Sequence, residues 1–167
     1  MTHRVDSPPA PAQMRGLRVA LIVSRYHASV TDRLRDAARA ALREAGAVDD
    51  AVTVVAVPGT FELPLAARHA AESGRFDAIV CLGCVIRGET PHFEFIASAV
   101  AHGITAASAE TGIPIAFGVL TTNTFDEAVG RAGEGPANKG WEAALAAVEL
   151  AQVCRSLTRE EPPEAAR

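Results

Sequence analysis

Four short apolar runs, each followed by a segment with helical character, constrain the fold of this 167-residue chain more than any other feature. The runs span residues 17–23, 52–57, 77–82 and 115–120. Short runs that are predominantly apolar and rich in β-branched residues are typical of strands buried on both faces. We expect helices over residues 30–45, 62–72, 91–110, 126–132 and 141–157. This alternation predicts an α/β fold, a three-layer αβα sandwich whose four-stranded, mainly parallel sheet carries helices on both faces.

The ends of the chain differ in composition from its middle. Pro8, Pro9 and Pro11 stand among small residues, so we expect residues 1–13 to form a flexible, Pro-rich arm. The length suits one domain with a single core, which we place at residues 14–157. Residues 158–167 are charged and contain proline, and they are expected to be a frayed tail.

Charge and hydropathy exclude two classes of partner. The net charge of −4 and the lack of a basic, aromatic-interleaved patch argue against nucleic acid. No apolar run approaches the length of a membrane span, and residues 1–16 contain no hydrophobic signal segment. These features predict a soluble, cytoplasmic protein without a membrane partner.

The three cysteines are Cys81, Cys84 and Cys154. An odd number in a chain without an export signal favours reduced thiols. Cys81 and Cys84 form a C-x-x-C pair, which leaves a redox pair or half a metal site open. However, Cys81 falls inside a predicted strand, whereas a redox pair would stand at the start of a helix, and no further metal ligands are spaced to match.

The segment after the third apolar run is the strongest candidate for chemistry. Pro91 suits the first position of a helix, and Thr90 suits its N-cap. The backbone N–H groups of residues 88–90 would then point from the positive end of the helix towards an anion, for which a phosphate is our candidate, with Arg87 beside it. His92, in the first turn, would lie close enough to exchange protons with that anion. The competing interpretation is that a histidine at this position is merely solvated or caps the helix.

Two further loops meet this segment. In parallel sheets, ligands bind at the carboxyl ends of the strands. Tyr26, residues 59–62 and residues 84–92 all follow strands at that edge. The sequence therefore predicts one site built from three loops.

The last predicted helix is apolar on two sides. Its polar residues Glu142, Glu149 and Ser156 recur every seven positions, and apolar residues cover most of the remaining surface. A surface helix of a monomer needs only one apolar stripe, so this pattern predicts a neighbouring subunit. The alternative is that its alanine-rich surface is only mildly apolar and stays solvated.

Taken together, these residues resemble lumazine synthase, an enzyme of riboflavin biosynthesis, from about Leu17 to Leu157. Four ordered blocks carry the resemblance: VPGTFELP at 57–64, LG at 82–83 with VIRGETPHF at 85–93, FGVLT at 117–121, and RAG at 131–133 with NKG at 138–140. The resemblance implies condensation of 5-amino-6-(D-ribitylamino)uracil with 3,4-dihydroxy-2-butanone 4-phosphate to 6,7-dimethyl-8-ribityllumazine, with release of phosphate and water. It implies no metal and no organic cofactor. We expect a flavodoxin-like winding of the sheet.

The resemblance also assigns roles to individual residues. Tyr26 would stack on the pyrimidine, and Glu62 would accept hydrogen bonds from the ribityl hydroxyls. The remaining substrate-binding residues would be Gly59, Thr60, Phe61, Cys84, Val85, Ile86 and Phe117. Gly88, Glu89, Thr90 and Arg131 would hold the phosphate. His92 would transfer protons, with Arg131 and Lys139 as the other catalytic residues.

Three positions depart from the family pattern. His27 stands where Asn is common, Cys84 where a small hydroxyl or apolar residue is usual, and Tyr26 where Phe or Trp is commoner. Tyr26 keeps a stacking face, whereas His27 adds a second imidazole near the site.

The assembly and two rival functions complete the predictions. The resemblance implies a homopentamer in which Phe117 and Arg131 reach the site of the adjacent subunit. A shell of sixty subunits, with riboflavin synthase as a candidate enclosed partner, is compatible with the short linker at residues 133–140. One rival is a flavin- or lumazine-binding oligomeric module with little or no turnover. The other is a flavodoxin-like phospholigand or redox protein that uses Cys81 and Cys84.

Overall fold

The computed structural model describes residue 14 and residues 16–159. The predicted arm at 1–13 and nearly all of the predicted tail lie outside the described residues. The strands are β1 (Val19–Ser24), β2 (Val52–Val57), β3 (Ala78–Ile86) and β4 (Ile115–Thr122). The helices are α1 (Ala28–Glu44), α2 (Leu63–Glu72), α3 (His92–Thr111), α4 (Phe125–Arg131) and α5 (Lys139–Thr158), and short 3₁₀ turns occupy Asp49–Ala51, Thr60–Glu62 and Gly135–Ala137.

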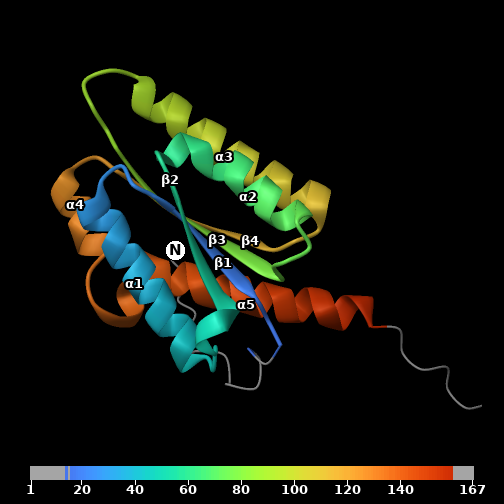
Figure 1. Cartoon of the computed structure of the whole chain (residues 1–167). Helices are drawn as coiled ribbons and strands as arrows, with labels where there is room; N and C mark the ends of the chain where they lie inside the picture. Colours follow the sequence, from blue (N-terminus) through green and yellow to red (C-terminus); the bar gives the residue numbers. More distant parts are fainter. Residues whose placement is uncertain (1–13, 15, 160–167) are drawn as a thin grey trace, which may run out of the picture.

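The four strands form one parallel sheet in the order β2-β1-β3-β4 (Figure 1). The two central strands are almost wholly buried, since every residue of β1 and the first seven of β3 are buried. β2 is an edge strand whose Val54 and Val55 remain exposed. The predicted parallel α/β fold is therefore confirmed.

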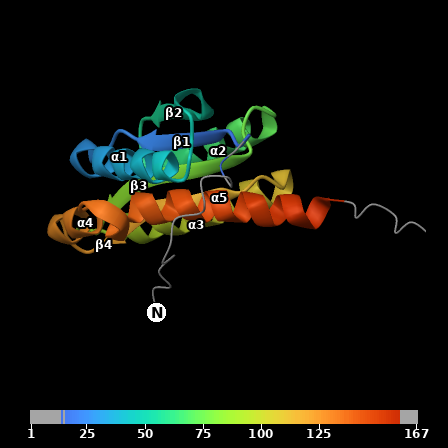
Figure 2. The ribbon, with the colours of Figure 1, turned by 90° about the horizontal axis from the view of Figure 1, so that it is seen from below.

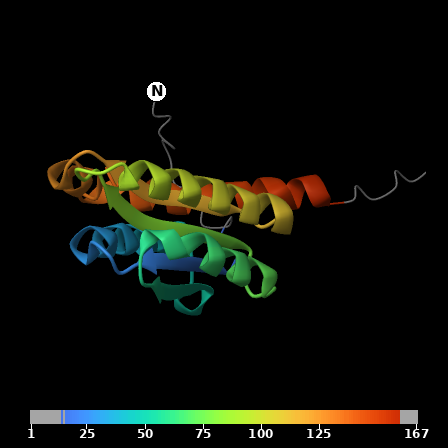
Figure 3. The same ribbon diagram turned by 90° about the horizontal axis from the view of Figure 1, so that it is seen from above.

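Helices cover both faces of the sheet. α1 and α5 pack on one face, and their apolar side chains form one core with alternate residues of β1 and β3, among them Leu21 and Leu82 (Figure 2). α2 and α3 pack on the opposite face around the intervening residues, among them Ile22 and Cys81 (Figure 3). Successive side chains of each central strand point to opposite faces of the sheet, so they pack into two separate cores.

Two local predictions at the candidate site were wrong. β3 does not end at residue 82 but continues to Ile86, because its last residues pair with β4 up to Ile86 opposite Thr122. Helix α3 starts at His92 with Pro91 as its N-cap residue, and no side-chain hydrogen bond from Thr90 caps it. Instead the Pro91 carbonyl accepts a hydrogen bond from the Glu94 N–H at 3.1 Å.

Two structural features are absent from the described part of the chain. No helix there is long and apolar enough to cross a membrane. No cluster of three or more His, Cys, Asp or Glu side chains there is placed to hold a metal ion.

Candidate active site

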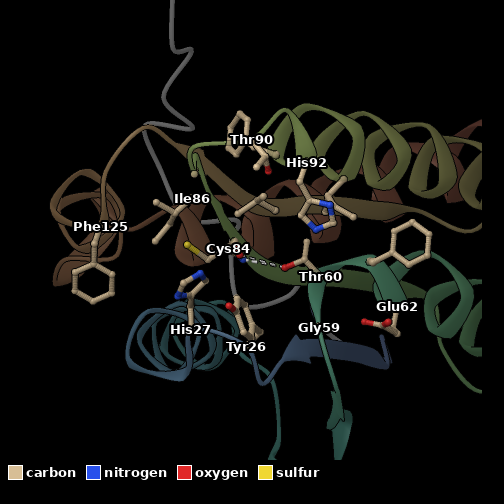
Figure 4. A pocket seen from close by; sticks show the side chains of 15 residues that line it. Tyr26, His27, Gly59, Thr60, Glu62, Cys84, Ile86, Thr90, His92 and Phe125 are labelled. Atoms are coloured by element: carbon tan, nitrogen blue, oxygen red, sulfur yellow. Dashed lines mark hydrogen bonds between the residues drawn. The ribbon is translucent and has the colours of Figure 1, made fainter.

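A cavity of about 560 Å³ opens at the carboxyl ends of β1, β2 and β3 and is closed on one side by the first turn of α3 (Figure 4). This volume is typical of a site for a small organic ligand. Its walls are formed by Tyr26, His27, Gly59, Thr60, Phe61, Glu62, Cys84, Val85, Ile86, Gly88, Thr90, His92, Phe93, Ile96 and Phe125. The three segments predicted to meet at this edge therefore do so.

The turn between β1 and α1 presents an aromatic ring to the cavity. Tyr26 is 67% exposed, and its ring lies edge-on to the His27 imidazole with 4.5 Å between the ring centroids. His27 adopts left-handed backbone angles (φ 58°, ψ 47°), which the turn stabilises because the His27 carbonyl accepts from the N–H groups of Val30 and Thr31. Partial burial lowers the pKa of His27 below its usual 6.5, so the ring is a neutral hydrogen-bonding group near pH 7.

The second wall follows β2. The Thr60 hydroxyl is buried and lies 3.3 Å from both the backbone N and the backbone O of Cys84, which ties this turn to β3. Phe61 and Glu62 stay exposed towards the cavity. A side chain at Gly59 would put its Cβ 2.9 Å from Oε2 of Glu62, so glycine leaves room for the carboxylate.

The two cysteines of the C-x-x-C pair both lie within β3 and are buried and free. Burial raises the pKa of Cys81 to about 12 and that of Cys84 to about 11. A thiol becomes a nucleophile or a redox partner through its thiolate, which these surroundings disfavour. The cysteine pair therefore acts as packing and cavity wall, and the redox rival loses its support.

The segment between β3 and α3 is exposed. Gly88 and Thr90 line the cavity with His92, whereas Glu89 is not among the lining residues. The N–H groups of residues 88–90 take part in none of the hydrogen bonds found within the described residues. Figure 4 shows His92 pointing from α3 across the cavity towards the turn that carries Thr60. An imidazole and two loop residues whose backbone N–H groups lack a partner within the described residues thus line the same cavity.

Three predicted site residues lie elsewhere. Phe117, Arg131 and Lys139 line a separate hollow of about 470 Å³ over β4 and the start of α5. Lys139 is paired there with Glu142, with 2.9 Å between Nζ and Oε2. Within one chain the structure does not bring these residues to the His92 cavity.

Sequence reasoning missed three residues of the cavity wall: Phe93, Ile96 and Phe125. Ile96 lies four residues beyond His92 on the same face of α3, so helical periodicity gave a usable signal for it, whereas Phe93, the next residue after His92, had no such signal. Phe125 begins α4, after β4, on the sheet edge that the other loops share. Its contribution to the cavity depends on how α4 packs and had no signal in the local sequence.

Comparison with known proteins agrees with this geometry. The sequence model of the family described as 6,7-dimethyl-8-ribityllumazine synthase matches residues 16–155. A 6,7-dimethyl-8-ribityllumazine synthase from Syntrophus aciditrophicus (strain SB) is 48% identical over 143 residues, which cover 86% of this chain and 93% of the relative. The chain therefore belongs to the 6,7-dimethyl-8-ribityllumazine synthase family.

Proposed function

We propose that the protein is a transferase of riboflavin biosynthesis. It condenses 5-amino-6-(D-ribitylamino)uracil with 3,4-dihydroxy-2-butanone 4-phosphate to 6,7-dimethyl-8-ribityllumazine, releasing phosphate and water. The observation that carries the proposal is the cavity itself, which is lined by an exposed aromatic ring, a carboxylate, an imidazole and two loop residues, Gly88 and Thr90, whose backbone N–H groups make no hydrogen bond within the described residues. Each of these groups matches one part of the two substrates.

The pyrimidine substrate would occupy the part of the cavity beside β1 and β2. The exposed ring of Tyr26 offers a flat face for stacking. The exposed Glu62 carboxylate accepts hydrogen bonds from the ribityl hydroxyls, and residues 84–86 line the opposite wall. Thr60 supports this arrangement indirectly, because its hydroxyl bonds to the backbone of Cys84.

The phosphate substrate would occupy the part beside α3. The N–H groups of residues 88–90 stabilise the phosphate at the positive end of the helix. His92, which shares the cavity wall with Gly88 and Thr90, then transfers protons during imine formation and phosphate loss. These steps need no group beyond the side chains and backbone of the protein.

We further propose that the site is shared between subunits. Family membership implies an oligomeric assembly, and the hollow formed by Phe117, Arg131 and Lys139 would face the His92 cavity of the next subunit in a pentamer. This arrangement gives a role to cations that lie apart from the cavity of their own chain. A shell of sixty subunits and enclosure of riboflavin synthase are finer proposals, and cytoplasmic location stays a prediction from the sequence.

One assay tests the activity. Purified protein is mixed with both substrates, and the absorbance and fluorescence of the lumazine product are followed. Turnover that depends on both substrates and exceeds the rate without protein is the expected result. Tight binding of a flavin without turnover would instead favour the rival binding module.

A further inference from the structure

Arg87 joins three elements next to the anion-binding segment, here called the anion loop (residues 88–91). Its Nη1 donates to Oε1 of Glu94 in α3 at 2.7 Å, and its Nε donates to Oδ1 of Asn123, after β4, at 3.0 Å. The guanidinium carbon lies 4.8 Å from the centre of the Phe93 ring. We call these four residues the Arg87 clasp.

The clasp ties both ends of the anion loop. The backbone N–H of Arg87 donates to the Thr122 carbonyl at 2.8 Å, which fixes the loop's start against β4. Phe93 and Glu94 fix its end, on the first turn of α3 next to His92. Between these ends the loop has little support, because Gly88 has open space around it and the Glu89 and Thr90 side chains make none of the hydrogen bonds found in the described residues.

Asn123 is a rigid anchor for the clasp. Its backbone N–H donates to Oε2 of Glu127 at 2.9 Å, and the Glu127 N–H donates to the Thr124 hydroxyl at 3.1 Å. Thr124 is the N-cap residue of α4, and the Glu127 carboxylate reaches one residue further back, to Asn123, so that both bonds hold the start of α4. Because the backbone of Asn123 is held at the start of α4, its side chain can keep the Arg87 guanidinium in a fixed place.

Arg87 itself is unsuited to bind the phosphate. It is absent from the cavity wall, its Nε and Nη1 donate to Asn123 and Glu94, and one face of its guanidinium lies over Phe93. The adjacent Glu94 carboxylate compensates the charge of the guanidinium and would repel a phosphate dianion. We propose that Arg87 is a positioning residue, which holds the anion loop and His92 in place through the clasp and makes no contact with the substrate.

This inference rests on the proposed function and makes a prediction opposite to that of direct phosphate binding. Glu94→Gln keeps the Arg87 charge but weakens the clasp, so it is expected to lower kcat/KM for the butanone phosphate about three- to tenfold, with the KM for the pyrimidine unchanged. Arg87→Lys, which retains the charge without the planar fork, is expected to have a similar effect. If Arg87 bound the phosphate, Glu94→Gln would free it and improve that kcat/KM.

Two controls separate positioning from a general structural effect. The double variant Arg87→Lys/Glu94→Gln is expected to lose little more than the more impaired single variant, since both changes weaken the same Arg87–Glu94 pair. Arg68 forms a comparable exposed cluster with Glu72 and Glu110 between α2 and α3, so Arg68→Lys is the matched control and is expected to leave the kinetics unchanged. The proposal would be overturned if the losses in kcat/KM added up in the double variant, or if Arg68→Lys lost as much as the Arg87 and Glu94 variants.

A binding measurement keeps the inference separate from the proposed activity. Inorganic phosphate is titrated calorimetrically into wild type and the Glu94→Gln variant, with the thermal midpoint recorded for each. The expected result is phosphate binding that is about threefold or more weaker in the variant at an unchanged midpoint. A wild type that binds phosphate without making lumazine would refute the proposed function alone, whereas tighter phosphate binding by the variant, or none by wild type, would refute the clasp.

Discussion

At the scale of single residues, His92 allows the cleanest separation of chemistry from folding. It is exposed on the first turn of α3, and its ring takes part in none of the hydrogen bonds found in the described part of the chain. Replacing the His92 side chain therefore breaks few contacts of the folded protein. A loss of rate on substitution can be assigned to proton transfer.

We expect His92→Ala to lower kcat and to leave the KM for the pyrimidine nearly unchanged. General acid–base catalysis typically contributes ~10²–10⁴-fold, and the loss should lie towards the low end, because orienting the two reactants already supplies part of the acceleration. Steady-state kinetics with each substrate varied in turn measure both parameters. An unchanged kcat with a raised pyrimidine KM would show that His92 binds and does not transfer protons.

His27 gives a prediction about pH. Burial lowers its pKa in the folded protein below the usual 6.5, so the unfolded chain takes up a proton at a pH where the folded chain does not. The folded protein is therefore more stable above pH ~6.5, where His27 is neutral in both states. It loses this stability as the pH falls below ~6.5 towards the pKa of the folded state, because only the unfolded chain gains the proton there. In His27→Asn, whose side chain tolerates left-handed backbone angles, the urea midpoint should fall less than that of wild type between pH ~7 and ~5. An NMR titration that places the His27 pKa at or above 6.5 would contradict the argument.

The residues of the cavity were predictable where a motif and a strand end coincide. Tyr26, the turn at 59–62 and the segment 84–92 each follow a strand, and the sheet gathers such loops at one edge. Phe125 was not predictable, because its place on the wall depends on the packing of α4. The separation of Phe117 and Arg131 from the cavity was implied by the resemblance alone, and that of Lys139 was not predicted, since no local pattern tells which subunit's site a side chain serves.

At the scale of elements, close approach of backbones decides where glycine is required. Gly140 is buried at the start of α5, where a Cβ would lie 2.1 Å from the Leu34 carbonyl oxygen of α1. The atoms that a Cβ would meet belong to the backbone of Leu34, so the two helices would have to move apart. The same reasoning explains Gly83, whose absent side chain leaves room for Thr60 and Leu63.

Gly140→Ala is therefore expected to destabilise the protein by about 1–3 kcal/mol or more, as overpacking does. Gly130 is the matched control, because a Cβ there meets nothing within 4 Å and its position is inside α4. Gly130→Ala should keep or raise stability by up to ~1 kcal/mol, through the higher helix propensity of alanine. Urea unfolding of both variants measures the difference, and a tolerated Gly140→Ala would show that α1 and α5 can separate at low cost.

Element types were more predictable than element ends. The sequence predicted every strand and helix of the sandwich, because apolar patterning reports burial. The end of β3 was placed too early, since Gly83 suggests a turn locally whereas pairing of Val85 and Ile86 with β4 extends the strand. Thr90 was a plausible cap by type, yet the structure uses the Pro91 carbonyl in that turn.

At the scale of the whole molecule, the chain leaves apolar surface uncovered. In α5, Leu145 and Val148 are buried in the core, whereas Leu150, Val153 and Leu157 are exposed. A hollow of about 610 Å³ between α3 and α5 is lined by Leu150 and Phe117. This is the second apolar side that the sequence predicted for the last helix, and it supports a neighbouring subunit.

The exposed surface predicts a neighbouring subunit, and the family resemblance predicts how many subunits assemble. Light scattering of the purified protein should find a pentamer or a multiple of five, with the full shell as one such multiple. A stable monomer or dimer that still forms the lumazine would contradict both the proposed shared site and the two-sided interpretation of α5.

Hybrid oligomers test the shared site directly. Suppose that each site takes His92 from one subunit and Arg131 from the next. Random mixing of equal amounts of the His92→Ala and Arg131→Ala variants then restores both residues in about a quarter of the sites. We therefore expect co-expressed variants, assayed at low butanone phosphate, to show roughly a quarter of wild-type activity and clearly more than either variant alone. If both residues served one site within a single chain, every site would lack one of them, and mixing would only average the two variants. Activity no higher than that average, in oligomers shown to contain both chains, would place Arg131 outside the neighbour's site.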